Sequence, residues 1–150
     1  MSTITRNRKA YHEYEILEKY EVGIKLLGVE VKALKESKGN LTGTYVKAIG
    51  GRLNLIGFNL PPYSKSGTLI DYDPNRSRLL LLSKKDVDVL IDKIDKQGFT
   101  LIPLKFYTKG SLIKLEIGLA KGKKKTDKKR YLIEAQEKRD IERIIKIQKR

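Results

Sequence analysis

The fold is decided by residues 99–120, FTLIPLKFYTKGSLIKLEIGLA, which carry the clearest strand signal of the 150-residue chain. Lys109 and Gly110 form a turn signal that divides this stretch into two halves. Successive side chains of a strand point to opposite faces, and one face of the second half collects apolar residues. These residues are Ile113, Leu115, Ile117 and Leu119. The pattern predicts two strands, over 99–108 and 111–120, joined by a tight turn.

Other elements are predicted on the N-terminal side of this pair. Strand-like alternation covers Tyr11–Leu27, Thr44–Ile49 and Arg52–Asn59, and residues 61–78 are expected to form a long mobile loop. Helical spacing predicts a short helix over Val29–Glu36 and a longer one over Ser83–Gly98. Short antiparallel strands with intervening helices favour a mainly β fold, an OB-type antiparallel β-barrel with flanking α-helices.

Charge divides the chain into a body and a tail. The sequence has 33 Lys+Arg against 18 Asp+Glu, a net charge of +15, and residues 121–150 hold 13 of the basic and 5 of the acidic residues. Residues 1–120 are therefore expected to form an OB-type RNA-binding body. Residues 121–150 form a basic tail that self-repulsion keeps unfolded in free solution. So large a positive charge favours an anionic partner, and nucleic acid is the usual one.

Several kinds of chemistry lack the residues they need. The chain has no cysteine and one histidine, His12, so thiolate metal sites and paired-histidine acid–base catalysis are not expected. Asp71 and Asp73 lie in a turn-rich segment where aspartate usually bonds its own backbone. Residues 1–16 lack the apolar run that is typical of a signal peptide, and no stretch of the sequence approaches the roughly 20 apolar residues that span a bilayer. We expect a cytoplasmic, monomeric protein without catalytic residues, metal, cofactor or membrane association.

Basic residues lie beside aromatic and amide side chains, a combination typical of RNA binding. Guanidinium groups bind phosphate, tyrosine rings stack on bases, and amides read base edges. The clusters on this ground are Arg6, Asn7, Arg8 and Lys9 beside Tyr11 and Tyr14, then Lys32, Lys35 and Lys38, and then Arg76 and Arg78. Glu21 has two open interpretations: it pairs with a nearby lysine, or it accepts hydrogen bonds from base amino groups.

The tail begins with a basic run from Lys121 to Arg130, followed by a weak amphipathic stretch over 131–148. This composition predicts a segment that orders only against a polyanion. A membrane-surface helix is the rival interpretation, against which the broken apolar stripe and the lack of Trp and Phe in the tail argue.

Short motifs along nearly the whole chain resemble the SsrA-binding protein (SmpB) family. They are NRKA (7–10), YEVG (20–23), GVEVK (28–32), DPNRSR (73–78) with LLL (80–82), IPL (102–104), and GLAKGKK (118–124) with DK (127–128). The resemblance implies an OB-type barrel that binds the tRNA-like domain of transfer-messenger RNA and delivers it to stalled ribosomes in trans-translation. It also implies a tail that enters the empty mRNA channel near the decoding centre and becomes helical there.

The resemblance carries residue roles onto matching positions. The implied RNA-facing set is Asn7, Tyr14, Glu21, Lys32, Asn40 and Tyr45, with help from Arg76 and Arg78. The implied ribosome-facing set is Lys121, Lys123, Lys124, Asp127, Lys128, Lys129 and Arg130. Thr126 stands where the family often has His or Tyr, and Lys129 where it has Arg.

Three other functions remain as alternatives. The nearest is a nonspecific single-stranded nucleic-acid-binding OB protein. The others are a nuclease that uses Asp71 and Asp73, and a membrane-surface protein.

Overall fold

The computed structural model describes residues 2–67 and 71–122. Ten elements follow one another in these residues. They are β1 (Ser2–Arg6), α1 (Ala10–Glu13), β2 (Tyr14–Ile24), α2 (Gly28–Ser37), β3 (Tyr45–Ile49), β4 (Arg52–Ile56), β5 (Arg78–Leu81), α3 (Lys84–Gln97), β6 (Thr100–Lys109) and β7 (Leu112–Gly122). Strands predominate, and every strand pairing is antiparallel.

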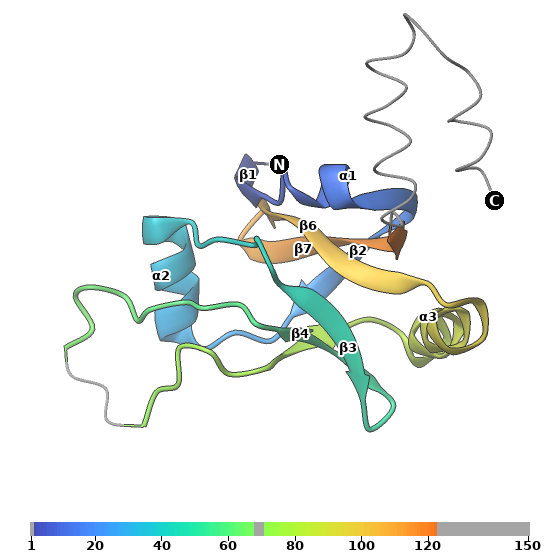
Figure 1. Ribbon diagram of the computed structural model, residues 1–150. Helices are drawn as coiled ribbons and strands as arrows, with labels where there is room; N and C mark the ends of the chain where they lie inside the picture. The colour runs from blue at the N-terminus through green and yellow to red at the C-terminus, as the bar shows by residue number, and fades with distance from the viewer. Residues whose placement is uncertain (1, 68–70, 123–150) are drawn as a thin grey trace, which may run out of the picture.

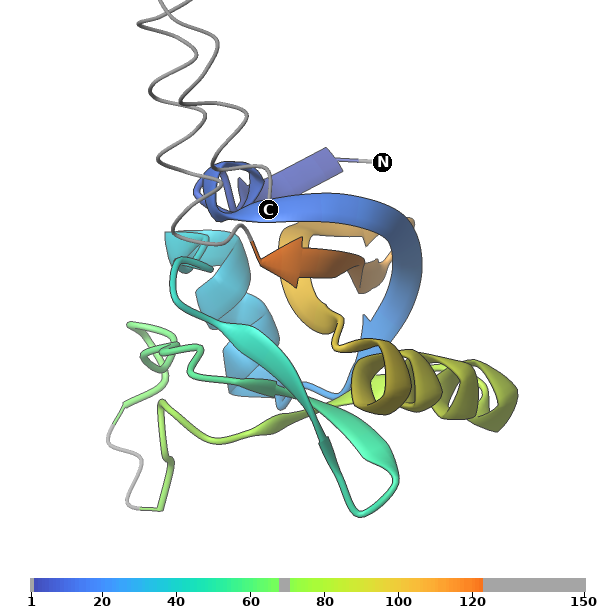
Figure 2. The same ribbon diagram turned by 45° about the vertical axis from the view of Figure 1, so that its right-hand side comes forward.

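The strands close into a barrel. The order of pairing runs β6–β3–β4–β5–β2–β7, and β7 pairs again with β6, which leaves β1 as an added strand beside β6. Figure 1 shows α2 and α3 on opposite sides of the sheet, with β1 and α1 together at one end. Figure 2 shows β2, in blue, curving around the side of the sheet. The predicted fold class, mainly antiparallel β with flanking helices, is confirmed.

The predicted pair of strands forms the centre of the fold. β6 and β7 pair from Thr100↔Ala120 to Lys109↔Leu112, and Leu115, Ile117 and Leu119 are buried as the alternation predicts. β7 continues two residues beyond the predicted end, because β2 supplies partners for them. Lys121, which was expected in the tail, therefore lies in the sheet opposite Glu15.

The longer helix follows its capping signals. The Ser83 side chain accepts a hydrogen bond from the Asp86 backbone N–H at 3.2 Å, and Gly98 ends α3 in the left-handed conformation. Val87 and Leu90 turn inward to the core. The predicted helix is confirmed to within one residue at each end.

Two elements at the N-terminus were not predicted. Tyr11 was expected in a strand, but it lies in α1, and β1 has no strand prediction at all. The Asn7 backbone N–H donates to the Leu104 carbonyl at 2.7 Å, and the Ala10 N–H donates to the Asn7 carbonyl at 3.2 Å. Ala10 is buried against Ile102, Leu104 and Ala120 of β6 and β7. Tertiary contacts therefore set the conformation of this segment.

Gly39 provides a test of how closely the loop between α2 and β3 packs against Phe58. Its φ is +65°, and a Cβ atom there would lie 2.6 Å from Cζ of the fully buried Phe58. Gly39→Ala is expected to lower the free energy of unfolding by about 2–3 kcal/mol, since backbone strain and overpacking add. Denaturant unfolding measures this change in the free energy of unfolding. Gly98→Ala is the control, with φ +69° and open space around it; equal losses for both variants would contradict the packing argument.

Candidate RNA interface

A hollow of about 250 Å³ lies between α1 and the start of β3. Four of the predicted RNA-facing residues line it: Asn7, Lys9, Tyr14 and Tyr45. Tyr14 begins β2 and is half-buried, whereas Tyr45 begins β3 and is 44% exposed. The fold thus brings two tyrosine rings and a lysine from separate elements to one concave surface.

Asn7 holds this hollow in place. Its side chain is 5% exposed, and its Nδ2 donates to the Pro103 carbonyl at 2.9 Å. Together with its backbone bond to Leu104, this fixes the turn between β1 and α1 on β6. Its side-chain N–H group is used inside the protein, so Asn7 acts on the site by positioning α1 and does not present its amide to solvent.

The hollow adjoins the end of the described body. Tyr14 pairs with Gly122, the last residue of β7, and a Cβ atom on Gly122 would lie 3.7 Å from the Tyr14 ring. The segment that follows Gly122 therefore starts beside the tyrosine of the candidate site. Predicted tail residues outside the described part of the chain are Lys123, Lys124, Asp127, Lys128, Lys129 and Arg130.

Glu21 lies elsewhere on the same strand. It is seven residues from Tyr14 along β2, a spacing of up to about 23 Å in extended chain, so the two residues do not share one pocket. Lys109 Nζ lies 3.2 Å from the Glu21 carboxylate. Hydrogen bonds from the Tyr107 hydroxyl and Lys109 lower the pKa of Glu21, so its carboxylate is ionised at neutral pH. The lysine pairing left open by the sequence is therefore present.

The remaining predicted residues are dispersed. Lys32 lies on α2 with its Nζ 5.8 Å from the centre of the Tyr63 ring. Asn40 is exposed in the loop before β3, where its Oδ1 accepts the Thr42 N–H at 2.9 Å. Arg6 and Arg8 line a different hollow, together with Tyr11 of α1. The structure therefore brings together only part of the predicted set.

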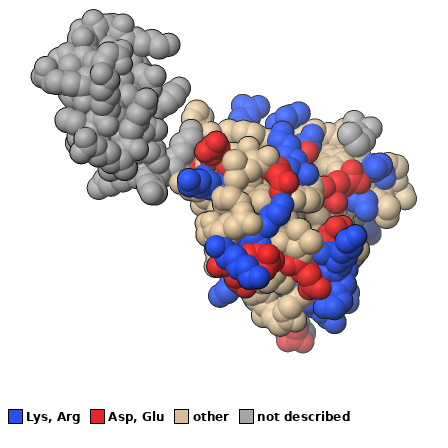
Figure 3. All heavy atoms as spheres, turned by 90° about the vertical axis from the view of Figure 1, so that its right-hand side faces the viewer, with Lys and Arg blue, Asp and Glu red and all other residues tan. Residues whose placement is uncertain are grey.

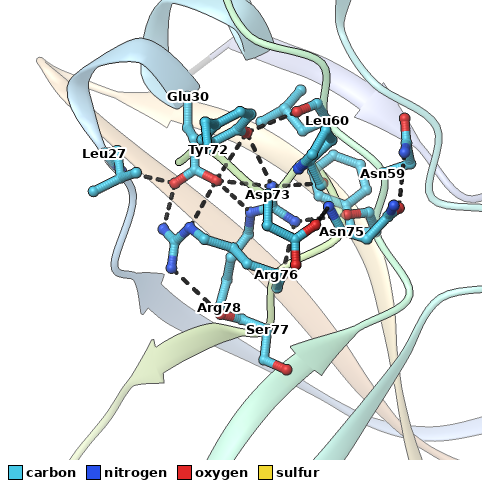
Figure 4. A network of polar contacts seen from close by, with 12 residues as sticks. Leu27, Glu30, Asn59, Leu60, Tyr72, Asp73, Asn75, Arg76, Ser77 and Arg78 are labelled. Atoms are coloured by element: carbon cyan, nitrogen blue, oxygen red, sulfur yellow. Dashed lines mark hydrogen bonds and ion pairs between the residues drawn. The ribbon is translucent and has the colours of Figure 1, made fainter. Parts of the chain in front are cut away.

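Arg78 is the clearest correction to the predicted set. Its side chain is 0% exposed, and Nε donates to Glu30 Oε2 at 2.8 Å. The two Nη atoms donate to the carbonyls of Phe58 and Pro74 at 2.6 and 3.0 Å. Figure 4 shows this guanidinium group enclosed by the network around Glu30. The prediction that Arg78 contacts RNA is wrong in this conformation, because the protein occupies its donors.

Arg76 belongs to the same network. Its guanidinium group makes an ion pair with Glu30, and its Nε donates to Glu30 Oε2 at 3.0 Å. Tyr72 donates its hydroxyl to the Leu60 carbonyl at 2.7 Å (Figure 4). The segment before β5, predicted as a mobile loop, is thus fastened to α2 by one buried carboxylate. Glu30 was missed, although it shares a buried helix face with Ala33 and Leu34.

The nuclease alternative depends on Asp71 and Asp73, which lie in the segment before β5. The Asp73 side chain accepts the Asn75 N–H at 2.9 Å, the local turn bond that its sequence context predicts. Across residues 2–67 and 71–122, no group of three or more His, Cys, Asp or Glu side chains could hold a metal ion. Within the same ranges, no helix has both the length and the apolar composition that crossing a bilayer requires.

Surface charge alone does not mark an interface. On the face that carries α3, Lys and Arg are interspersed with Asp and Glu (Figure 3). The exposed ion pairs on α3 follow this pattern, as in Lys84–Asp88 at 3.6 Å and Lys96–Asp92 at 3.0 Å. The site is therefore better identified by its hollows and aromatic rings than by net charge.

Comparison with known proteins places these features in a family. The model of the family described as SmpB protein matches residues 4–147. An SsrA-binding protein of Microcystis aeruginosa is 46% identical over 143 residues, 95% of this chain and 93% of that protein. Another, of Dechloromonas aromatica, is 43% identical over 148 residues, 99% of each chain.

The fold agrees with a solved relative. A chain in the structure described as "tmRNA-SmpB: a journey to the center of the bacterial ribosome" is 43% identical, with a TM-score of 0.66. The match covers 85% of this chain and 93% of that one. The family resemblance inferred from the motifs is confirmed: this chain belongs to the SmpB protein family.

Proposed function

We propose that this protein is the RNA-binding adaptor of trans-translation in the bacterial cytoplasm. Its body binds the tRNA-like domain of transfer-messenger RNA and delivers it to stalled ribosomes. Family membership supports this role, as does the likeness to a chain from a structure described as tmRNA-SmpB in the bacterial ribosome. The work is binding and placement, and no catalytic step is assigned to the protein.

The observation that carries the proposal is the hollow beside α1. Tyr14 and Tyr45 supply rings from two strands, and Lys9, which pairs with Glu13 at 3.7 Å, supplies a cation in the same lining. Bases that are not stacked in a helix bind aromatic rings, as in single-stranded loops of folded RNA. A folded RNA with unpaired loop bases, such as a tRNA-like domain, fits such a surface better than a regular duplex.

We assign the second half of the function to the basic tail. Its cationic residues would bind the RNA of the small subunit, in the empty mRNA channel near the decoding centre. Counterion release favours that association, and ordering of the segment as a helix accompanies it. This division of labour, body on one RNA and tail on another, is a proposal that rests on charge distribution and family.

Tyr45→Ala is expected to weaken binding to transfer-messenger RNA about 5- to 150-fold, since one base–aromatic stack contributes about 1–3 kcal/mol. Tyr45 is suitable because it is exposed at the start of β3, so its loss does not open the core. Fluorescence anisotropy with labelled RNA measures the dissociation constant. Tyr45→Phe, which keeps the ring, is the matched control and is expected to bind nearly as well as the unchanged protein.

An unrelated RNA of equal length separates the proposal from a nonspecific single-strand binder. The adaptor prefers transfer-messenger RNA, and that preference survives as salt is raised. Equal affinities with equal salt dependence for both RNAs, or no loss in the Tyr45→Ala variant, would favour the nonspecific binder.

A further inference from the structure

A second hollow, of about 310 Å³, has Tyr11 of α1 in its lining and shares no lining residue with the Tyr14–Tyr45 hollow. Its charged and aromatic lining comes from β1, the turn before α1, α1, β2, β6 and β7. The residues are Arg6, Arg8, Tyr11, Lys19, Lys105 and Glu116. Four cations and one tyrosine therefore surround a single carboxylate.

The carboxylate of Glu116 has an unfavourable neighbour. Glu116 pairs with Glu21 across β2 and β7, and residues directly opposite on adjacent strands point to the same face of the sheet. Like charges in that position destabilise a sheet. Glu21 has Lys109 and the Tyr107 hydroxyl as partners. Glu116 therefore has a like charge opposite it on β2, and Lys105 opposite it on β6 is the nearest cross-strand source of a counter-charge.

Glu116 keeps its acceptor capacity. In the described part of the chain, none of the seven ion pairs involves Glu116. Lys105 is its cross-strand partner on β6, but the Lys105 Nζ lies over the Tyr107 ring, 5.4 Å from the centroid. The two oxygens of Glu116 can therefore accept hydrogen bonds from a ligand in the hollow.

Tyr11 provides the aromatic surface of this hollow. It is 48% exposed, and Lys19 Nζ lies 5.7 Å from the centre of its ring. Such a cation–π contact is weak at an exposed site, so a flat ligand can replace the lysine at the ring face. Lys19 would then be available for a phosphate, together with Arg6 and Arg8.

We propose that this hollow binds one unpaired nucleotide of the RNA held by the body, with guanine preferred. The base stacks on Tyr11, Glu116 accepts hydrogen bonds from its Watson–Crick edge, and the arginines bind the flanking phosphates. This site deepens the proposed RNA-binding function and rests on it. Glu116, Lys19 and Lys105 were not among the residues expected to bind RNA.

The preference for guanine follows from donor geometry. The N1–H and N2–H groups of guanine are adjacent on one edge, so a carboxylate can accept both in a bidentate contact. Adenine and cytosine offer one amino group on that edge, and uracil one ring N–H. A pocket built only for phosphate would bind better without Glu116, because its negative charge repels the ligand.

The test uses the full-length protein and two octamer RNAs, UUUUGUUU and UUUUAUUU. The unchanged protein is expected to bind the guanine octamer about 5- to 150-fold more tightly, the usual discrimination of a bidentate contact. Glu116→Gln removes the preference by weakening the guanine complex. Anisotropy titration measures the dissociation constant of each octamer for each protein. The basic tail contributes equally to the binding of the two octamers, so it does not affect their ratio.

Two further variants keep the outcome decisive. Glu15→Gln makes the same charge change outside the hollow, on β2 opposite Lys121, and is expected to leave the ratio unchanged. Tyr11→Ala is expected to weaken the binding of both octamers. Equal binding of the octamers by the unchanged protein, or tighter binding of both by Glu116→Gln, would overturn the proposal in favour of a phosphate-only surface. Because these octamers are not transfer-messenger RNA, this failure is distinguishable from failure of the adaptor function.

Discussion

Glu30→Gln is expected to lower the free energy of unfolding by about 3–5 kcal/mol, the usual loss when one partner of a buried ion pair is removed. The Glu30 side chain is 0% exposed and pairs with Arg78, which is equally buried, and with Arg76. Glutamine keeps the size of the side chain but leaves the Arg78 charge without a counter-charge. Chemical denaturation followed by far-UV circular dichroism measures the loss.

The exposed ion pair between Glu18 and Lys93 provides the control. Its N–O distance is 2.7 Å, close to that of the buried pair, but the Glu18 side chain is 45% exposed. Glu18→Gln is expected to change the free energy of unfolding far less than Glu30→Gln does, since solvent screens such pairs. The double variant Glu30→Gln with Arg78→Met should recover part of the loss, because it removes the uncompensated charge. Similar losses for Glu30→Gln and Glu18→Gln would contradict the assignment of Glu30 as the central residue of this network.

The same network predicts a dependence on acid. Burial acts to raise the pKa of Glu30, but the hydrogen bonds from Arg76 and the Leu27 N–H, with the charge of Arg78, hold it below its ordinary value of 4.5. A lowered folded-state pKa means that the unfolded chain takes up the proton first as pH falls. The stabilisation is therefore complete above about pH 4.5 and is lost as pH falls through the folded pKa. Glu30→Gln should remove this component of the acid sensitivity.

The central strands and the long helix were predictable because their signals are local. Ser83 caps α3, Gly98 ends it, and the buried Val87 and Leu90 are three residues apart. α1 was not predictable in this way, because four residues are too few for a helical period. Its position depends on Asn7, whose bonds to β6 reach almost 100 residues along the chain.

The candidate site was predictable in its residue types and less so in its grouping. Tyr14 follows from its basic surroundings and Tyr45 from the family resemblance, and only the fold shows that they line one hollow. Arg78 was misassigned because arginine near other basic residues is typical of RNA binding, while its partner Glu30 lies 48 positions earlier. The one sequence signal of that pairing was the spacing of Glu30 on α2, three and four residues before the apolar Ala33 and Leu34.

Removal of residues 123–150 is expected to leave binding to isolated transfer-messenger RNA nearly intact and to abolish tagging on stalled ribosomes. The body ends at Gly122 and not at residue 120, because Lys121 and Gly122 pair with Glu15 and Tyr14. A cut after Ala120 would remove part of the sheet beside the Tyr14–Tyr45 hollow and confuse loss of the tail with damage to the site. Anisotropy titration and a tagging assay with purified stalled ribosomes measure the two activities.

This truncation should change the affinities for transfer-messenger RNA and for an unrelated RNA by different amounts. Residues 123–150 hold 12 Lys+Arg and 5 Asp+Glu, so their removal takes seven of the fifteen net positive charges. Nonspecific binding depends on neutralised phosphates, so affinity for an unrelated RNA should fall and lose much of its salt dependence. Binding through stacking in the hollow does not depend on that charge. Preference for transfer-messenger RNA should therefore increase when the tail is removed, and a truncated chain that loses both RNAs equally would show that the tail, not the body, holds them.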